Sequence, residues 1–301
     1  MIKLHKLTTE KLSTWVKEAK SQAVKGNIMQ RIPFLALANP DWFAVHICCK
    51  SGETYTQGDT DCVFPLMSLI KPFSLLYLLE QVGVEEVLKW VGIEPSDQPF
   101  NSLEQLIADN GYPRNPMINS GAITLADKLP GKEPTQLFCQ WLNKLAGCQL
   151  ELDQKMLDSV RSTHSSANIA IAHHLHYNGH IKDINLALDI YEEICCISGK
   201  VADLALLGKL LACESNFVKL QNRQIVNALM LTCGLYEDSA KFAVKIGLPM
   251  KSGISGALLA IIPDQVAIAC YSPNLDSTGN SVAGLALTQI LSQELQLSIF
   301  S

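Results

Sequence analysis

Ser68 and Lys71 are the side chains whose types and spacing best suit nucleophilic chemistry. Residues three apart on a helix share one face, with about 5–6 Å between their Cβ atoms. An amine at that spacing can accept the serine proton when burial lowers its pKa. The start of a helix adds backbone N–H groups and a positive dipole, which stabilise a developing oxyanion. The Ser-x-x-Lys pair therefore predicts a serine that is transiently acylated.

The neighbourhood of this motif favours a catalytic over a structural role. A Ser-x-x-Lys spacing arises often by chance, and on a surface it is usually only a solvated pair. Apolar residues precede it at 64–66 and follow it at 73–76, however, and a buried lysine without a function is costly. Downstream, Lys251-Ser252-Gly253 begins a predicted strand. A Lys-Ser/Thr-Gly strand is the third element of serine acyltransferases that use a Ser-x-x-Lys nucleophile.

The elements that must position these motifs follow from the hydrophobic pattern. A period near 3.6 predicts a first helix over residues 3–25, a long apolar helix from the motif to Gly83, and mostly helices over 85–230. Alternating or β-branched runs predict strands at both ends of the chain. The predicted strands are 42–49, 54–56, 241–249, 255–263 and 265–273. A last helix is predicted over 280–296.

This order of elements predicts an α/β fold of the α+β type. An antiparallel sheet is built from both ends of the chain and flanked by the terminal helices, and an all-helical lobe packs beside it. We expect one catalytic domain over 1–301, with a sheet lobe at about 1–66 and 235–301 and a helical lobe at about 67–234. Active sites favour the cleft between such lobes.

Composition excludes several other classes of protein. The 301 residues carry 24 Lys and Arg against 29 Asp and Glu, a net charge of −5 without a basic cluster, so neither nucleic acid nor an anionic membrane is an expected partner. The apolar runs are shorter than the roughly 20 residues that span a bilayer, and the N-terminus lacks the apolar core of a signal peptide. Ten cysteines without a Cys-x-x-Cys pair predict buried thiols in a reducing cytoplasm.

Five segments resemble the serine-dependent glutaminase family, whose fold is like that of β-lactamases and penicillin-binding proteins. They are GDTDCVFPLMSLIK (58–71), NPMINSGAI (115–123), NIAIAHHL (168–175), TCGLYEDSAKFAVKIGLPMKSGISGALLAIIP (232–263) and GNSVAG (279–284). The resemblance runs from about Ile32 to Gly284. Block 232–263 is long and rich in unusual residue choices, which makes the resemblance specific.

The resemblance implies a role for each matching residue. Ser68 matches the nucleophile and Lys71 its activating amine, while Tyr236 matches the tyrosine that passes a proton to the leaving ammonia. Lys251 is expected to place positive charge near that tyrosine and the substrate. Other matches are the substrate-binding residues Asn119, Asn168 and Tyr191, and the oxyanion-hole N–H groups of Ser68 and Ile254.

The activity implied is hydrolysis of the side-chain amide of L-glutamine to L-glutamate and ammonia through a γ-glutamyl-serine ester. No metal and no organic cofactor is expected. The cluster His173, His174, His176 and His180 lacks a matching acidic ligand and is interpreted as a partly solvated helix face. The family is typically oligomeric, so a homodimer or homotetramer is expected.

Two departures from the family pattern bear on the substrate. Arg31 stands where the family has a tyrosine, and Arg161 stands where it has a glutamate, seven residues before Asn168. In the family that glutamate is a substrate-site anion, suited to the α-ammonium of glutamine. Two positive charges about 4 Å apart repel by roughly 1–4 kcal/mol in such a site. With Arg161 facing the substrate, we therefore expect Arg161→Glu to raise glutamine turnover.

Three interpretations of Arg161 remain open at this point. The alignment shifts and Asp158, one helical turn earlier, supplies the carboxylate; or Arg161 points away and the protein is a weak glutaminase. In the third, the pocket takes a different amide, with a negative or neutral group in place of the ammonium. A non-enzymatic, regulatory family member is a further alternative, which the intact set of Ser68, Lys71 and Tyr236 disfavours.

Overall fold

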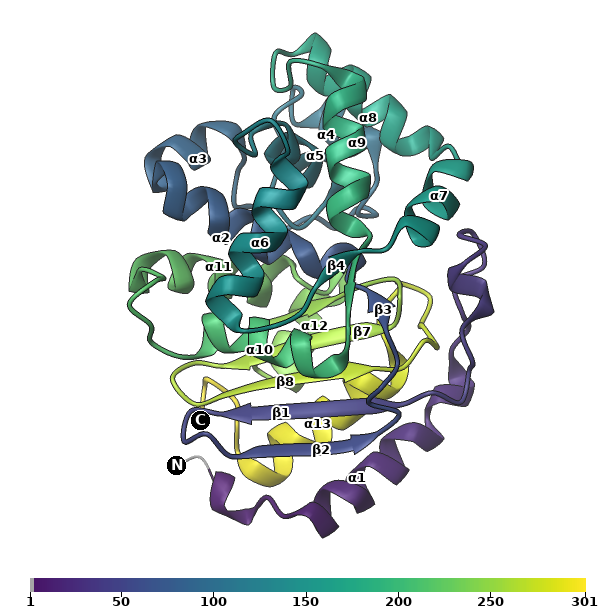
Figure 1. The fold of residues 1–301 in the computed structure, drawn as a ribbon, viewed down its shortest axis with the longest axis vertical. Helices are drawn as coiled ribbons and strands as arrows, with labels where there is room; N and C mark the ends of the chain where they lie inside the picture. The colour runs from purple at the N-terminus through teal and green to yellow at the C-terminus, as the bar shows by residue number, and fades with distance from the viewer. Residues whose placement is uncertain (1–2) are drawn as a thin grey trace.

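The main sheet joins two hairpins from opposite ends of the chain. The computed structural model describes residues 3–301 (Figure 1). The strands are β1 (Ala44–Cys49), β2 (Thr54–Gly58), β6 (Met250–Ser252), β7 (Ala257–Ile262) and β8 (Val266–Tyr271). They are antiparallel in the order β2-β1-β8-β7-β6, so β8 is central. Strand β6, which carries Lys251 and Ser252 of the Lys-Ser-Gly motif, thereby lies at one edge of the sheet.

Strands β1, β7 and β8 are buried on both faces, which explains why they are continuously apolar, whereas the edge strand β2 alternates between exposed and half-buried residues. Successive side chains of a strand point to opposite faces. Val45 and Ile47 pack into the core under the terminal helices, whereas Ala44 and Cys48 join the core of the helical part. Two hydrophobic cores therefore meet back to back across one sheet.

The terminal helices cover one face of the sheet. These are α1 (Thr9–Ser21), capped by the Thr8 hydroxyl, and α13 (Val282–Leu295), capped by the Ser281 hydroxyl. The predicted helix over 3–25 is in fact α1 with a short 3₁₀ turn before it and another after it. Capping by Thr8 sets the true start of the regular helix, because a β-conformation cap residue cannot continue a helix backward.

A group of helices lies on the other side of the sheet (Figure 1). The helices of this group and their bounds are α2 (Lys71–Val82), α3 (Val84–Trp90), α4 (Leu103–Ala108), α5 (Asn119–Asp127), α6 (Pro134–Ala146), α7 (Gln154–Ser162), α8 (Ser166–Tyr177), α9 (Ile184–Cys195), α10 (Val201–Ala212) and α11 (Leu220–Cys233). Of these, α10 packs directly on β1, β7 and β8. The sheet is thus sandwiched between the terminal helices and the helical part.

A second, three-stranded sheet that the sequence pattern did not indicate lies near the Ser-x-x-Lys motif. Its strands are β3 (Phe64–Pro65), β5 (Ile197–Gly199) and β4 (Glu151–Leu152), in the order β3-β5-β4. Leu66 N donates to the Ile197 carbonyl at 2.8 Å, and the Phe64 ring stacks on Tyr271 with ring centroids 4.4 Å apart. These contacts anchor the segment that leads into the motif.

The strand predicted over 241–249 is wrong. Residues Ser239–Lys245 form helix α12, and the chain then turns into β6. The alternation in KFAVKI suggests a strand, which would place Phe242, Val244 and Ile246 on one face. Instead Phe242 and Ile246 are buried while Val244 is 89% exposed. Burial at i and i+4 is the pattern of a helix, and packing has overridden the local alternation.

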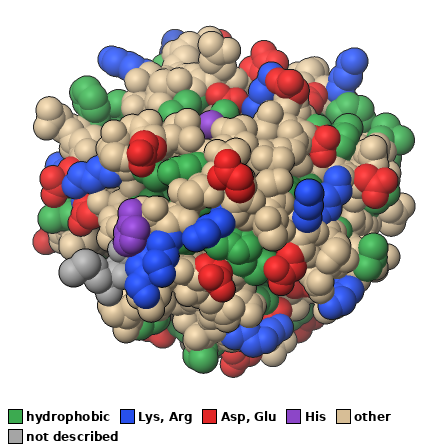
Figure 2. Space-filling model, turned by 90° about the horizontal axis from the view of Figure 1, so that it is seen from below, with side chains coloured by type: hydrophobic (Ala, Val, Ile, Leu, Met, Phe, Trp, Pro, Cys, Tyr) green, Lys and Arg blue, Asp and Glu red, His purple; other side chains and the backbone are tan. Residues whose placement is uncertain are grey.

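Charges of both signs are interspersed on the face below the sheet, as Figure 2 shows. Such mixing is typical of a water-facing surface with a modest net charge. Over residues 3–301, no helix combines the length and the apolar character that crossing a membrane requires.

We expect Gly208→Ala to destabilise the protein. A Cβ at position 208 of α10 would lie 2.6 Å from Leu259 Cδ1 and 2.9 Å from Ala267 Cβ. Alanine gains about 1 kcal/mol in helix propensity, but overpacking costs about 1–3 kcal/mol, and Ala267 belongs to the central strand and cannot move alone. The net loss, about 1 kcal/mol, is measured as a lower urea midpoint with an unchanged slope. A higher midpoint would contradict this packing.

Candidate active site

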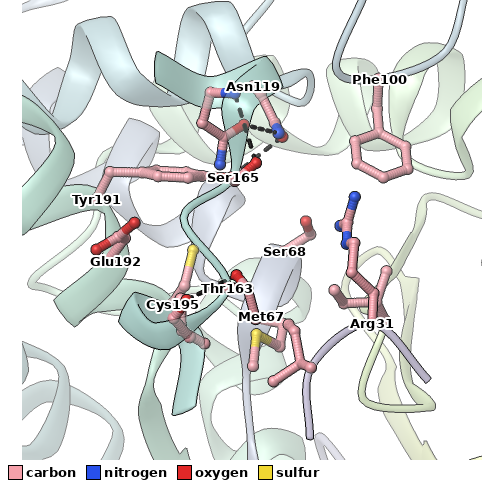
Figure 3. Close-up of a pocket in the computed structure, with 14 residues that line it drawn as sticks. Arg31, Met67, Ser68, Phe100, Asn119, Thr163, Ser165, Tyr191, Glu192 and Cys195 are labelled. Atoms are coloured by element: carbon pink, nitrogen blue, oxygen red, sulfur yellow. Dashed lines mark hydrogen bonds between the residues drawn. The ribbon is translucent and has the colours of Figure 1, made fainter. Parts of the chain in front are cut away.

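Ser68 lies where β3 gives way to a helix, and it lines a pocket of the protein (Figure 3). It is in a short 3₁₀ helix, Met67–Ile70, that continues into α2. Met67 has φ = +49°, a conformation that costs a non-glycine residue about 1–3 kcal/mol. This sharp turn, held by β3 and β5, aims the Ser68 hydroxyl into the pocket. The serine is 7% exposed.

Lys71 lies beneath the pocket rather than in solvent, with 1% of its surface exposed. Its Nζ donates to the Met117 carbonyl at 3.1 Å and to Asn119 Oδ1 at 2.8 Å. Burial lowers the Lys71 pKa from 10.5 to about 8. A neutral amine has two N–H bonds, both used here, and a remaining lone pair that can accept a proton. In its neutral form this amine can therefore act as a base.

No hydrogen bond joins Lys71 Nζ to Ser68 Oγ within residues 3–301. Contacts of a general base are often long until substrate binds, so burial and the i,i+3 placement carry the assignment. Both groups start the same buried helix.

One amide, that of Asn119, connects the catalytic helix to the helical part. Its Oδ1 accepts from Lys71 and, at 3.1 Å, from the Tyr191 hydroxyl, and its Nδ2 donates to Asn168 Oδ1 at 2.8 Å. Burial raises the pKa of Tyr191 well above its usual value, so its hydroxyl stays a donor. Side chains from α2, α5, α8 and α9 are thereby fixed relative to one another.

Tyr236 and Lys251 approach Ser68 from the sheet side. Tyr236 has φ = +57°, and its hydroxyl donates to the Ser252 carbonyl at 3.2 Å. Burial raises its pKa, an effect that a hydrogen bond with Ser68 partly offsets. Lys251 Nζ lies 4.5 Å from the centre of the Tyr236 ring and donates to the Gly234 and Ser252 carbonyls.

Burial opposes the positive charge expected on Lys251. The side chain is fully buried, and burial first, with the charge of Lys71 second, lowers its pKa well below the usual value. Over residues 3–301, neither lysine forms an ion pair with a carboxylate. Two uncompensated amines in one dry site favour the neutral form of each.

The backbone N–H groups of Ser68 and Ile254 are available to a developing oxyanion. Both residues line the pocket, and in residues 3–301 neither N–H donates to another protein atom. The loop after β6 comes this close because residue 253 is glycine: a Cβ there would lie 2.8 Å from the Leu66 carbonyl oxygen. Unpaired N–H groups at one spot suit an oxyanion hole.

The predicted site residues fall into three groups by position. The pocket is lined by Ser68, Asn119, Asn168, Tyr191 and Ile254. Lys71, Tyr236 and Lys251 are buried behind it. Arg161 lies outside, because its guanidinium turns to α9 and pairs with Asp189 at 3.1 Å, Glu192 at 3.7 Å and Glu193 at 3.5 Å. Asp158, the alternative carboxylate, does not line the pocket either, and it accepts a hydrogen bond from Gln154.

Two charged side chains line the pocket, and only Arg31 is expected there from the sequence. Within residues 3–301, Arg31 is its one cation and Glu192 its one anion. Glu192 follows Tyr191 on α9 and was missed; its position next to a matched substrate-binding residue was the available signal. The apolar and small polar lining was also missed, namely Met67, Phe100, Val160, Thr163, Ser165 and Cys195. In the part of the chain described, no group of His, Cys, Asp or Glu could hold a metal ion.

The antiparallel sheet between terminal helices and a helical part, with the Ser-x-x-Lys turn at their junction, is a β-lactamase-like fold. The structure described as probable glutaminase ybaS matches it with a TM-score of 0.90 at 33% identity, over 98% of this chain and all of that one. One described as a probable glutaminase from Bacillus subtilis, complexed with 6-diazo-5-oxo-L-norleucine, matches with 0.88 at 28% identity, over 97% of each chain.

Sequence comparison points the same way. A family model described as Glutaminase matches residues 26–300. A glutaminase of Synechocystis sp. is 45% identical over 95% of this chain and 89% of its own length, and one of Cronobacter sakazakii is 35% identical over 98% and 99%. The chain belongs to the glutaminase family. The predicted family and fold class are confirmed, and the protein is an amidohydrolase.

We expect kcat/KM for ammonia release to rise with pH and to level off above an apparent pKa near 8. Lys71 must be neutral to accept the Ser68 proton, and its pKa is lowered to about 8, so the protonated form that cannot act as a base dominates below that pH. A pH-rate profile measures this. Lys71→Arg, whose guanidinium keeps its proton, should be inactive throughout. A wild-type profile that is flat or falls across pH 8 contradicts the assignment.

Proposed function

We propose that the protein hydrolyses the side-chain amide of L-glutamine to L-glutamate and ammonia through an ester on Ser68. One observation carries the proposal: a buried amine, whose two hydrogen bonds leave its lone pair free, starts the same helix as a pocket-lining serine. Membership of the glutaminase family supports the reaction type and the small amide substrate.

Acylation follows from the positions of these groups. Ser68 Oγ attacks the amide carbon and its proton passes to Lys71 Nζ, while the N–H groups of Ser68 and Ile254 hold the oxyanion. The C–N bond then breaks, and Tyr236 gives the leaving nitrogen the proton it needs to depart as ammonia. Because burial raises the Tyr236 pKa, this hydroxyl holds its proton until a strong base develops beside it. The proton on Lys71 then passes to the Tyr236 oxygen, so both groups return to their starting protonation states.

Deacylation uses the same groups in reverse. Water attacks the γ-glutamyl ester, one water proton passes to the base, and the oxyanion collapses with cleavage of the bond to Ser68 Oγ. That oxygen takes the proton back, and glutamate leaves. Neither half requires a group other than this chain's residues and water.

A related amidohydrolase with an altered substrate is the second candidate, favoured by Arg31. This guanidinium lines the pocket beside Phe100 and Ser68 (Figure 3), and within residues 3–301 it forms no ion pair. Arg31 adds a positive charge where the resemblance implies a neutral tyrosine. An amide that carries an extra anionic group would gain from it.

We further propose that the protein works in the cytoplasm as a homodimer or homotetramer. The resemblance to the glutaminase family supports the assembly. The ten cysteines, all of them free thiols and most of them buried, suit a reducing compartment. The division into a sheet lobe and a helical lobe is likewise proposed as the architecture of one catalytic domain.

We expect the wild-type protein to release ammonia from millimolar L-glutamine and Ser68→Ala to be slower by at least about 1,000-fold. Intact-mass measurement after rapid quenching should find a γ-glutamyl adduct on the wild type alone. Ser74→Ala is the matched control, since this buried serine of the same helix does not line the pocket and donates to the Lys71 carbonyl.

Other results of this experiment would support a different function or mechanism. A wild type that is inert to glutamine but acylated on Ser68 by another amide supports the second candidate. The absence of an adduct with every member of an amide panel supports a regulatory protein. Activity that survives Ser68→Ala overturns the mechanism.

A further inference from the structure

Glu192 is a pocket carboxylate whose charge is not fully compensated. It lies on α9 with 18% of its side chain exposed, and its ion-pair partner is Arg161 Nε at 3.7 Å. That distance is longer than a charge-assisted hydrogen bond of about 2.7–2.9 Å. Figure 3 shows the carboxylate beside Tyr191, on the side of the pocket opposite Arg31. A small cation in the pocket could approach it.

Arg161 cannot neutralise Glu192, because three carboxylates share it. Asp189 at 3.1 Å and Glu193 at 3.5 Å also pair with the guanidinium, so three acids face one base and the cluster has two negative charges in excess. Arg161 Nε is itself buried without a hydrogen-bond partner. The arginine therefore holds Glu192 in place without removing the negative potential that a ligand would meet.

The electrostatics of the pocket follow from this arrangement. Burial raises the pKa of Glu192, and the charge of Arg161 works against that shift. The lining holds the carboxyl group of Glu192 and the guanidinium of Arg31, with Ser68 between them in Figure 3. A free α-amino acid carries a positive ammonium group, which can pair with a carboxylate of the lining, whereas an uncharged amide without that group cannot.

We propose that Glu192 binds the α-ammonium group of the substrate, with Arg161 as the residue that positions it. This proposal rests on the proposed function. It adds that the substrates are free α-amino acids with a terminal carboxamide. It replaces the substrate-facing role first expected for Arg161. Arg161→Glu would add a fourth acid to this cluster and should lower glutamine turnover, the reverse of the sequence-based expectation.

The test compares two substrates that differ only in the ammonium group. L-Glutamine has it, and glutaramate, which is glutamine without its α-amino group, does not. We expect Glu192→Gln to lower kcat/KM for L-glutamine about 10- to 100-fold, mainly through KM, because a hydrogen bond to a charged group is lost. The same variant should change kcat/KM for glutaramate by less than about threefold.

Two further variants separate positioning from simple folding effects. Arg161→Gln should raise KM for L-glutamine and leave kcat and the glutaramate reaction nearly unchanged. Asp158→Asn is the matched control: this exposed carboxylate lies on the same helix as Arg161 but neither pairs with it nor lines the pocket, so both substrates should react as with the wild type. Circular dichroism and thermal unfolding should be the same for all four proteins.

The outcomes distinguish this proposal from the function it rests on. The role of Glu192 alone is overturned if the wild type turns over glutamine and Glu192→Gln either leaves kcat/KM for glutamine unchanged or lowers kcat/KM for glutamine and glutaramate equally. A wild type that neither releases ammonia from glutamine or glutaramate nor forms an adduct on Ser68 overturns both.

Discussion

The site depends on the Lys71 amine, which is kept away from water and has no carboxylate partner among residues 3–301. Lys71 is 1% exposed, and the acceptors of its two hydrogen bonds are neutral oxygens. Lowering its pKa from 10.5 to about 8 corresponds to roughly 3 kcal/mol. Because the folded pKa is depressed, this penalty is carried fully below pH 8 and vanishes as pH rises through 10.5, so this group makes the fold more stable in base. The two back-to-back cores supply the burial that offsets it.

The rest of the pocket is organised around the same helix start. Asn119 ties the amine to Tyr191 and Asn168, and hence to three helices of the helical part. From the sheet, β6 brings Lys251, and the loop that follows β6 brings the Ile254 N–H. The charged groups lie apart from the buried Lys71 amine. Arg161 turns outward to the acids of α9, and Glu192 is the acidic side chain that lines the pocket.

The sequence predicted those elements whose structure is determined by residues close together in the chain. The i,i+3 pair of Ser68 and Lys71, the terminal helices and the β7–β8 hairpin are set within short windows, and the sequence indicated each of them. Asn119, Tyr191 and Tyr236 meet Ser68 across long sequence separations, so only a family resemblance could bring them together. The β3-β5-β4 sheet has strands of two or three residues, too short for a period to be read. The outward turn of Arg161 depends on three acids of another helix, which no spacing around residue 161 encodes.

The most direct test is the ionisation of Lys71 itself, followed by NMR of the protein labelled with ¹³C at lysine Cε. The account predicts a resonance that titrates near pH 8, well below the ordinary lysine value of 10.5, and that disappears in Lys71→Met. Lys251→Met assigns any second shifted resonance. If the resonance lost in Lys71→Met titrates at the ordinary value, the amine is charged at working pH and cannot activate the serine.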